Sequence, residues 1–186
     1  MSVEMGKNLF LVGLPGVGKS TVGKILSLRL GKKFIDTDDL IENELNLSIL
    51  EIFDKFGEDY FRDCESKVIS ELFSDRDCES EHTAVISLGG GAVLREANRK
   101  VLVENGAVVW LKITPEVLIE RLKSNNESLR PVIRELSLEF LSELDSIRSP
   151  IYEKISNATV EVTDKNPAEI AEEVKLIYNK LQDERI

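Results

Sequence analysis

The sequence predicts an α/β protein with a five-stranded parallel sheet and helices on both faces. Short apolar runs alternate with longer stretches of helical periodicity, which is typical of successive β-α-β units. The first apolar run leads through a glycine-rich turn, Gly13–Ser20, into a helical stretch, and such a turn forms a phosphate-binding loop. The length of 186 residues, without an internal linker or repeat, predicts a single domain over 1–186.

The elements follow each other regularly along the chain. Apolar runs bounded by turn or cap residues predict strands at 9–12, 33–35, 84–88, 107–112 and 159–162. Apolar residues at helical spacing predict helices at 19–30, 40–45, 49–56, 60–73, 97–104, 115–122, 138–147 and 167–181. The last two strand-to-helix connections carry start signals, because Thr114 and Asn166 each precede a proline and can cap a helix that begins there.

The segment 123–131 (KSNNESLRP) fits neither a helix nor a strand. Its Asn-Asn pair and its proline disfavour a continuous helix, so it predicts a mobile excursion between two helices. Such excursions often serve as lids in phosphotransfer enzymes. We therefore expect a mobile lid at about 123–137.

Composition and charge limit the classes of partner. The chain has 24 Lys+Arg against 34 Asp+Glu, a formal net charge of −10, which argues against nucleic-acid and anionic-membrane binding. No apolar run is long enough for a membrane span, and the N-terminal residues lack a secretory pattern, so we expect a cytoplasmic protein. Cys64, Cys78 and the single His82 lack the spacing of a zinc site or disulfide framework.

The glycine-rich turn matches a complete nucleotide-binding motif. Gly13, Gly18, Lys19 and Ser20 fit the pattern G-x-x-x-x-G-K-[ST], and the strand before and helix after it argue against a chance match. Backbone N–H groups of such a loop surround phosphates, while the lysine reaches the β- and γ-phosphates and the hydroxyl binds Mg²⁺. The predicted nucleotide ligands are Gly13, Gly16, Val17, Gly18, Lys19, Ser20 and Thr21.

Two aspartates follow the second predicted strand. Asp36 and Asp38 stand where ligands bind in open α/β sheets, and they could serve a metal ion and a substrate hydroxyl respectively. The alternative is that Asp38 or Asp39 caps the helix that begins near Leu40. These residues alone support both interpretations equally.

Two further patterns point to a second ligand. Arg62 and Glu65 share one face of a predicted helix, where the carboxylate can orient the guanidinium; a weak surface ion pair is the alternative. Three successive glycines, 89–91, follow a buried strand, and they are costly there unless the backbone bends sharply or meets a ligand. Ligand contact is the better interpretation of the glycines.

Taken together, these motifs resemble one enzyme family. The segments GLPGVGKST, DTD, FRDCE, LGGGAV, LRP and RSPIY, in this order and at these intervals, resemble shikimate kinase from Leu9 to about Pro167. The resemblance implies a three-layer α/β/α phosphate-loop kinase fold with strand order 2-3-1-4-5. It also implies ATP- and Mg²⁺-dependent phosphorylation of the 3-hydroxyl of shikimate, a step of aromatic amino acid biosynthesis.

The resemblance also implies roles for individual residues. Lys19, Asp38 and Arg130 would be catalytic: Asp38 would hold and deprotonate the acceptor hydroxyl, and Arg130 would close over the transferring phosphate from the lid. Asp36 would lie on the magnesium side beside Ser20.

The substrate side follows from the same resemblance. Arg62 and Arg148 would grip the substrate carboxylate, with Glu65 orienting Arg62. The glycines would line the pocket with backbone amides; they are Gly89, Gly90 and Gly91. Phe53 and Phe61 match apolar pocket positions for which a core role is equally plausible, and Arg121 and 163–167 are candidates for adenine contacts.

Two other functions share the same loop and sheet. A kinase for gluconate or a nucleoside monophosphate would need a different acceptor pocket, and the sequence shows no pocket for a base. A non-catalytic relative should have lost Lys19, Asp38 or Arg130, and all three are present. We expect a monomer whose partner is a small molecule.

Overall fold

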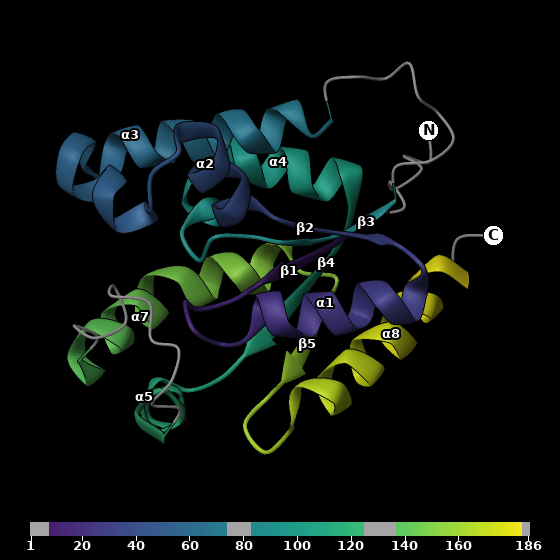
Figure 1. Cartoon of the computed structure of the whole chain (residues 1–186). Helices are drawn as coiled ribbons and strands as arrows, with labels where there is room; N and C mark the ends of the chain where they lie inside the picture. Colours follow the sequence, from purple (N-terminus) through teal and green to yellow (C-terminus); the bar gives the residue numbers. More distant parts are fainter. Residues whose placement is uncertain (1–7, 74–82, 125–136, 184–186) are drawn as a thin grey trace.

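The structure is a computed structural model that describes residues 8–73, 83–124 and 137–183. Five parallel strands form one sheet in the order β2-β3-β1-β4-β5, as the resemblance implied (Figure 1). All five predicted strands are confirmed within two residues at either end. They are β1 (Asn8–Val12), β2 (Lys33–Asp36), β3 (Ala84–Ser87), β4 (Gly106–Lys112) and β5 (Ala158–Glu161).

Helices cover both faces of this sheet, which makes three layers. The helices are α1 (Lys19–Leu30), α2 (Thr37–Leu45), α3 (Ile49–Glu71), α4 (Glu96–Asn105), α5 (Pro115–Ser124), α7 (Leu138–Ile155) and α8 (Pro167–Asp183). A short 3₁₀ turn, η1 (Ala92–Leu94), was not predicted. In Figure 1, α1 and α8 lie side by side below the sheet, whereas α2, α3 and α4 lie above it.

The alternation of side chains along β1 divides the core in two. Leu9 and Leu11 belong to the cluster shared with α1, α5 and α8, while Phe10 and Val12 belong to the cluster shared with α3, α4 and α7. A third, smaller apolar cluster joins α2 to α3. It holds α3 against α2 on both sides of the kink at Gly57, and α3 carries several of the predicted site residues.

Three predicted helix boundaries were wrong. Helix α7 continues to Ile155 through Pro150; proline forfeits one backbone hydrogen bond, but Tyr152 and Ile155 on the extension pack into the core. Helix α2 begins at Thr37 instead of Leu40, because the Asp36 carboxylate accepts from the Asp38 amide and caps it.

The third boundary lies within α3. The gap expected between two helices is reduced to a kink at Gly57, whose φ of 81° and ψ of 173° break the helix for one residue. The start signal at Asn166 is confirmed, since its side-chain oxygen accepts from the amides of Ala168 and Glu169.

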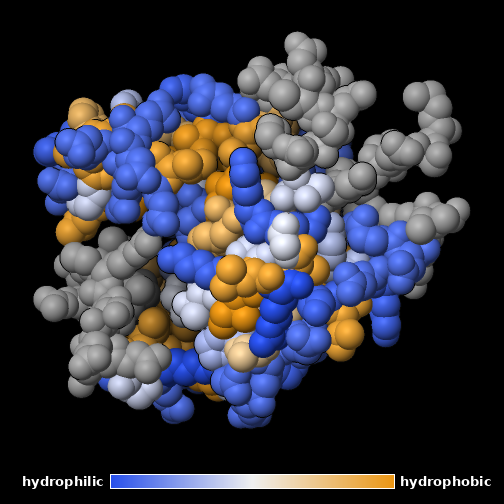
Figure 2. Space-filling model, turned by 45° about the vertical axis from the view of Figure 1, so that its right-hand side comes forward, coloured by the Kyte–Doolittle hydropathy of each residue, from blue (hydrophilic) through white to orange (hydrophobic). Residues whose placement is uncertain are grey.

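The structure also shows the character of the surface and which of the remaining predicted features lie within the described residues. Figure 2 shows one face on which hydrophilic residues predominate and apolar residues reach the surface in patches near the middle. Within the described ranges, no helix has the length and apolarity needed to cross a bilayer. The lid predicted at 123–137 falls outside the described residues except for Lys123, Ser124 and Ser137. Arg130, Cys78 and His82 also fall outside them.

Candidate active site

The loop between β1 and α1 has the backbone shape of a phosphate cradle. Gly13, Gly16 and Gly18 have φ of 146°, 82° and 102°, conformations that residues with a side chain rarely adopt. A Cβ on Gly13 would also lie 2.5 Å from the carbonyl oxygen of Leu111 on β4. The glycines therefore let the loop turn sharply and pack against the sheet.

Of the other predicted nucleotide ligands, three side chains differ in their surroundings. Lys19 is buried, and its Nζ donates to the carbonyl oxygens of Gly13 and Leu14, each at 2.9 Å, so the ammonium lies inside the loop. Val17 packs into the core below the loop, whereas Thr21 is exposed in the first turn of α1.

Ser20 and Asp36 come together at the carboxyl edge of the sheet. The Ser20 hydroxyl donates to Asp36 Oδ2 at 2.6 Å, and Ser87 Oγ lies 3.4 Å from Ser20 Oγ. The register of β2 and β3 sets Asp36 opposite Ser87, so strand pairing fixes this cluster of oxygens. Ser87 was not predicted as a site residue, although its place at the end of β3 beside the glycines could have indicated it.

Thr37 links the same strand ends. Its buried hydroxyl donates to the carbonyl oxygen of Ser87 at 3.4 Å and accepts from the amide of Gly89 at 3.2 Å. The amide of Gly89 is thereby already engaged. Because Thr37 stands between Asp36 and Asp38, this bridge also fixes where the two aspartates lie relative to the glycines. Thr37 was not among the predicted site residues.

Asp38 faces the glycine segment together with Glu65. A Cβ on Gly89 would lie 2.8 Å from Asp38 Oδ1 and 2.5 Å from Glu65 Oε1, so both carboxylates approach this one backbone position. The interpretation of Asp38 or Asp39 as the helix cap was wrong, because Asp36 is the cap. Asp38 therefore lies in the first turn of α2 with its carboxylate toward the site.

The pair of Arg62 and Glu65 is buried, so the surface-pair alternative was wrong. Arg62 Nη1 donates to Glu65 Oε2 at 3.0 Å, and the side chains are 12% and 0% exposed. Burial, opposed by Arg62 and aided by Asp38, raises the pKa of Glu65 to about 7. Glu58, which the sequence did not single out, accepts from Arg62 Nη2 at 3.0 Å.

Arg148 reaches the site from α7. It is buried, and a Cβ on Gly90 would lie 3.1 Å from its Nη1. Burial lowers the pKa of Arg148, and the positive charge of Arg62 lowers it further against the opposing effect of Tyr152. Two guanidinium groups thus meet in one buried region, an arrangement that favours an anionic ligand.

Each glycine of the triplet leaves room for a different side chain. Gly89 makes room for Asp38 and Glu65, and Gly90 makes room for Arg148. A Cβ on Gly91 would overlap the guanidinium of Arg62, although its φ of −95° is open to any residue. The triplet is therefore needed for the space that it leaves to these side chains and not for an unusual backbone conformation.

The remaining candidates lie at either side of this site. Arg121 on α5 donates through Nη2 to the carbonyl oxygens of Val162 and Thr163, which brings it to the segment after β5 that was a candidate for adenine contacts. The rings of Phe53 and Phe61 are 4.9 Å apart, and Phe61 is buried in the small α2–α3 cluster.

Three comparisons with known proteins agree on the family. The family model described as shikimate kinase matches residues 15–178. A shikimate kinase from a Sulfurihydrogenibium species is 36% identical over 168 residues, which cover 90% of this chain and 95% of that protein. One from Dehalococcoides mccartyi is 38% identical over 173 residues, 93% of this chain and 94% of that protein. The chain belongs to the shikimate kinase family.

Solved structures agree with this assignment. The shikimate kinase from Acinetobacter baumannii in complex with shikimate has a TM-score of 0.80 and 31% identity, covering 96% of each chain. A gluconokinase from Sinorhizobium meliloti has a TM-score of 0.60 and 19% identity, covering 95% of this chain and 94% of that one. The second likeness shows the common fold alone.

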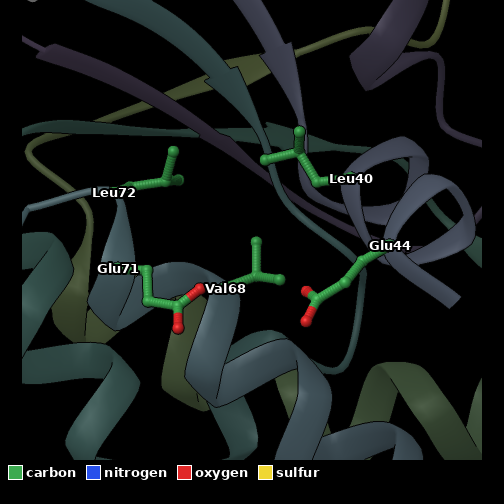
Figure 3. A pocket seen from close by; sticks show the side chains of 5 residues that line it. All are labelled: Leu40, Glu44, Val68, Glu71 and Leu72. Atoms are coloured by element: carbon green, nitrogen blue, oxygen red, sulfur yellow. The ribbon is translucent and has the colours of Figure 1, made fainter.

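A separate hollow lies between α2 and α3. It has a volume of about 310 Å³ and is lined by Leu40, Glu44, Val68, Glu71 and Leu72 (Figure 3). Lys67 pairs with both of its carboxylates. None of the lining residues is a predicted site residue, so the hollow is distinct from the cluster at the sheet edge.

Proposed function

We propose that this member of the shikimate kinase family transfers the γ-phosphoryl group of ATP to the 3-hydroxyl of shikimate, a step of aromatic amino acid biosynthesis. One observation carries the proposal: a phosphate cradle, an aspartate and the guanidinium groups of the buried Arg148 and the half-buried Arg62 meet at one edge of the sheet. A phosphate loop alone would fit any kinase of this fold. The paired guanidinium groups favour an acceptor that carries a carboxylate.

Ser20 and Asp36 suit Mg²⁺. Their oxygens are 2.6 Å apart beside the phosphate cradle, and Mg²⁺ prefers oxygen ligands supplied by one or two protein groups together with phosphates and water. When bound, Mg²⁺ would neutralise charge that develops on the phosphates.

The protein itself positions the reacting groups. Lys19 would leave the loop carbonyls for the phosphates, because charged oxygens are stronger acceptors than carbonyl groups. Asp38 would accept a hydrogen bond from the acceptor hydroxyl and take its proton as the phosphoryl group is transferred. Arg62 and Arg148 would bind the carboxylate and so set the hydroxyl toward the phosphate.

Arg130 completes the proposed catalytic set. Its role over the transferring phosphate rests on the resemblance of its sequence segment to the family, since it lies outside the described residues. A lid at about 123–137 is also part of the proposal; it rests on the Asn-Asn pair and the proline of 123–131, and it would exclude water so that ATP is not hydrolysed.

A coupled assay of ADP release tests the proposal, with shikimate, gluconate and AMP offered as separate acceptors. We expect turnover with shikimate and background rates with the other two. Turnover with gluconate or AMP but not shikimate would overturn the proposed acceptor. Absence of turnover with all three, while MgATP still binds, would instead support a non-catalytic relative.

We also propose that the protein acts in the cytoplasm as a monomer. The formal net charge of −10 disfavours binding to nucleic acid or anionic membranes. Sedimentation at working concentration, with and without both substrates, tests the monomer. A dimer in either condition would contradict it.

A further inference from the structure

Tyr152 lies in α7 four residues after Arg148, hence on the same side of the helix. Its side chain is fully buried, and its ring centroid is 5.8 Å from that of Trp110 on β4. The apolar contacts fix the ring and therefore the position of the hydroxyl. A phenylalanine would make the same apolar contacts, so packing alone does not explain the hydroxyl.

The hydroxyl joins two parts of the site. It donates to the carbonyl oxygen of Gly90 at 2.6 Å, and it interacts with the guanidinium of Arg148, whose Nη1 would lie 3.1 Å from a Cβ on the same glycine. Because the guanidinium has only donors and the single hydroxyl proton goes to Gly90, the tyrosine oxygen can face Arg148 only as an acceptor. The hydroxyl therefore fixes Arg148 relative to the glycine segment.

The two guanidinium groups of the site are held in different ways. Arg62 has two carboxylates, Glu58 and Glu65, within hydrogen-bond distance. No ion pair to a carboxylate is found for Arg148 within the part of the chain that the structure describes, and its Nε there has no hydrogen-bond partner. A tyrosine orients Arg148 without cancelling its charge, whereas a carboxylate would do both.

We propose that Tyr152 is a positioning residue, which holds Arg148 against Gly90 in the orientation that binds the acceptor carboxylate and does so without adding a negative charge that would compete with that carboxylate. This inference rests on the proposed function, because it assumes a carboxylate acceptor at Arg148. Burial raises the pKa of Tyr152 above its ordinary value, so the hydroxyl keeps the proton that it donates to Gly90.

The test begins with Tyr152→Phe, which removes the hydroxyl and keeps the ring. Loss of one hydrogen bond to a charged group should raise the KM for shikimate about tenfold. The KM for ATP and kcat should stay close to those of the parent. Tyr178→Phe is the matched control: Tyr178 is also buried, but on α8 in the opposite core cluster, and its substitution should leave both KM values unchanged.

A double-mutant cycle separates positioning from general packing. If Tyr152 acts through Arg148, Tyr152→Phe should change kcat/KM for shikimate little in an Arg148→Ala background. An equal loss in both backgrounds, or an unchanged KM in the single variant, would overturn the inference. Equal rises in the KM values for ATP and shikimate would also overturn it, since they would indicate a merely structural role.

A second substitution at position 152 and the assay of the parent protein complete the test. If Tyr152→Phe does not fold, a difluorotyrosine at position 152 keeps the ring and hydroxyl but weakens the oxygen as an acceptor, and a smaller rise in the KM for shikimate is expected. An unchanged KM with this analogue would count against the inference. If the parent protein does not phosphorylate shikimate, the proposed function itself is wrong. The assay of the parent protein alone distinguishes this outcome from a failure of the inference about Tyr152.

Discussion

The proposed nucleotide end and the proposed acceptor end of this site are built on different principles. The nucleotide end is one continuous segment, Gly13–Ser20, whose backbone shape and helix start form the cradle. The acceptor end collects side chains from α2, α3 and α7 around the glycines that follow β3. A short motif can therefore specify the first end, whereas the second exists only when distant segments have packed.

The two ends also differ in their electrostatics. At the nucleotide end, the Lys19 ammonium rests on neutral carbonyl groups. At the acceptor end, charges are buried against each other: the pKa of Glu65 is raised to about 7, and Arg62 and Arg148 repel each other. An anionic ligand would relieve this repulsion, so the acceptor end should depend more on its charged side chains.

The largest expected effect is on chemistry, at the junction of the two ends. Asp38→Asn should lower kcat by about two to four orders of magnitude, the range for a positioned general base, while MgATP binding persists. Steady-state kinetics and nucleotide binding measure the two quantities. Asp39→Asn removes the neighbouring carboxylate in the same first turn and is the control. Near-normal turnover of Asp38→Asn would leave Asp38 without a catalytic role.

Arg148→Ala should separate the two ends through their KM values. Losing a buried charged contact costs about 2–5 kcal/mol, or about 30- to 4,000-fold in affinity, so the KM for shikimate should rise by that factor while the KM for ATP stays the same. Arg148→Lys should rescue only in part, because an ammonium lacks the planar fork.

Two controls accompany this substitution. Arg29→Ala removes a guanidinium from the surface of α1 and should leave both KM values unchanged. A shikimate analogue with an alcohol in place of the carboxylate should be a poor substrate for the parent and lose little more activity with Arg148→Ala. Equal discrimination between the two acceptors by parent and variant would contradict the carboxylate contact.

The buried acid at the acceptor end should make stability depend on pH. The pKa of Glu65 is raised from 4.5 to about 7, so the folded protein holds a proton that the unfolded chain releases between these values. This contribution to the free energy of unfolding is full below about pH 4.5 and is lost as pH rises to about 7, with a magnitude on the order of 3 kcal/mol.

Urea unfolding of the ligand-free protein from pH 5 to pH 8 measures it. Glu65→Gln, which resembles the protonated acid, should lack this component of the pH dependence and gain stability relative to the parent as pH rises. Parallel curves for the two proteins would show that Glu65 is ionised throughout this range.

The smallest expected effects come from replacing one glycine at each end by alanine. Gly91→Ala should displace Arg62 and raise the KM for shikimate about tenfold, because overpacking costs about 1–3 kcal/mol. Gly18→Ala meets no atom within 4 Å but has φ of 102°, so strain of about 1–2 kcal/mol should raise the KM for ATP by a similar factor.

Gly31→Ala is the control for this pair. Gly31 has φ of 64° and no atom near its missing Cβ, but it ends α1 away from the site. It should lower stability and leave both KM values alone. If Gly91→Ala and Gly18→Ala each raised both KM values, the two ends would not be separable as described.

Much of the fold could be predicted from local patterns, and the errors occurred where tertiary packing overrides them. Pro150 signals the end of a helix, yet α7 continues because the residues beyond it pack into the core. The spacing of Arg62 and Glu65 predicted their contact but not its burial, which depends on α2 and the glycine segment closing over α3. Tyr152 belongs to the RSPIY segment, but its partner Gly90 is 62 residues away in sequence.

The sequence by itself determined the nucleotide end, because a phosphate cradle depends on local backbone conformation, and the glycines of Gly13–Ser20 encode that conformation directly. It also determined the layers of the fold through the alternation of short apolar runs with longer stretches of helical periodicity. Only the tertiary structure decided how Asp38, Glu65 and Arg148 converge on 89–91. Such contacts arise from strand order and helix packing. The burial and charge repulsion that shift pKa values arise in the same way, because they depend on distances between residues that are far apart in sequence.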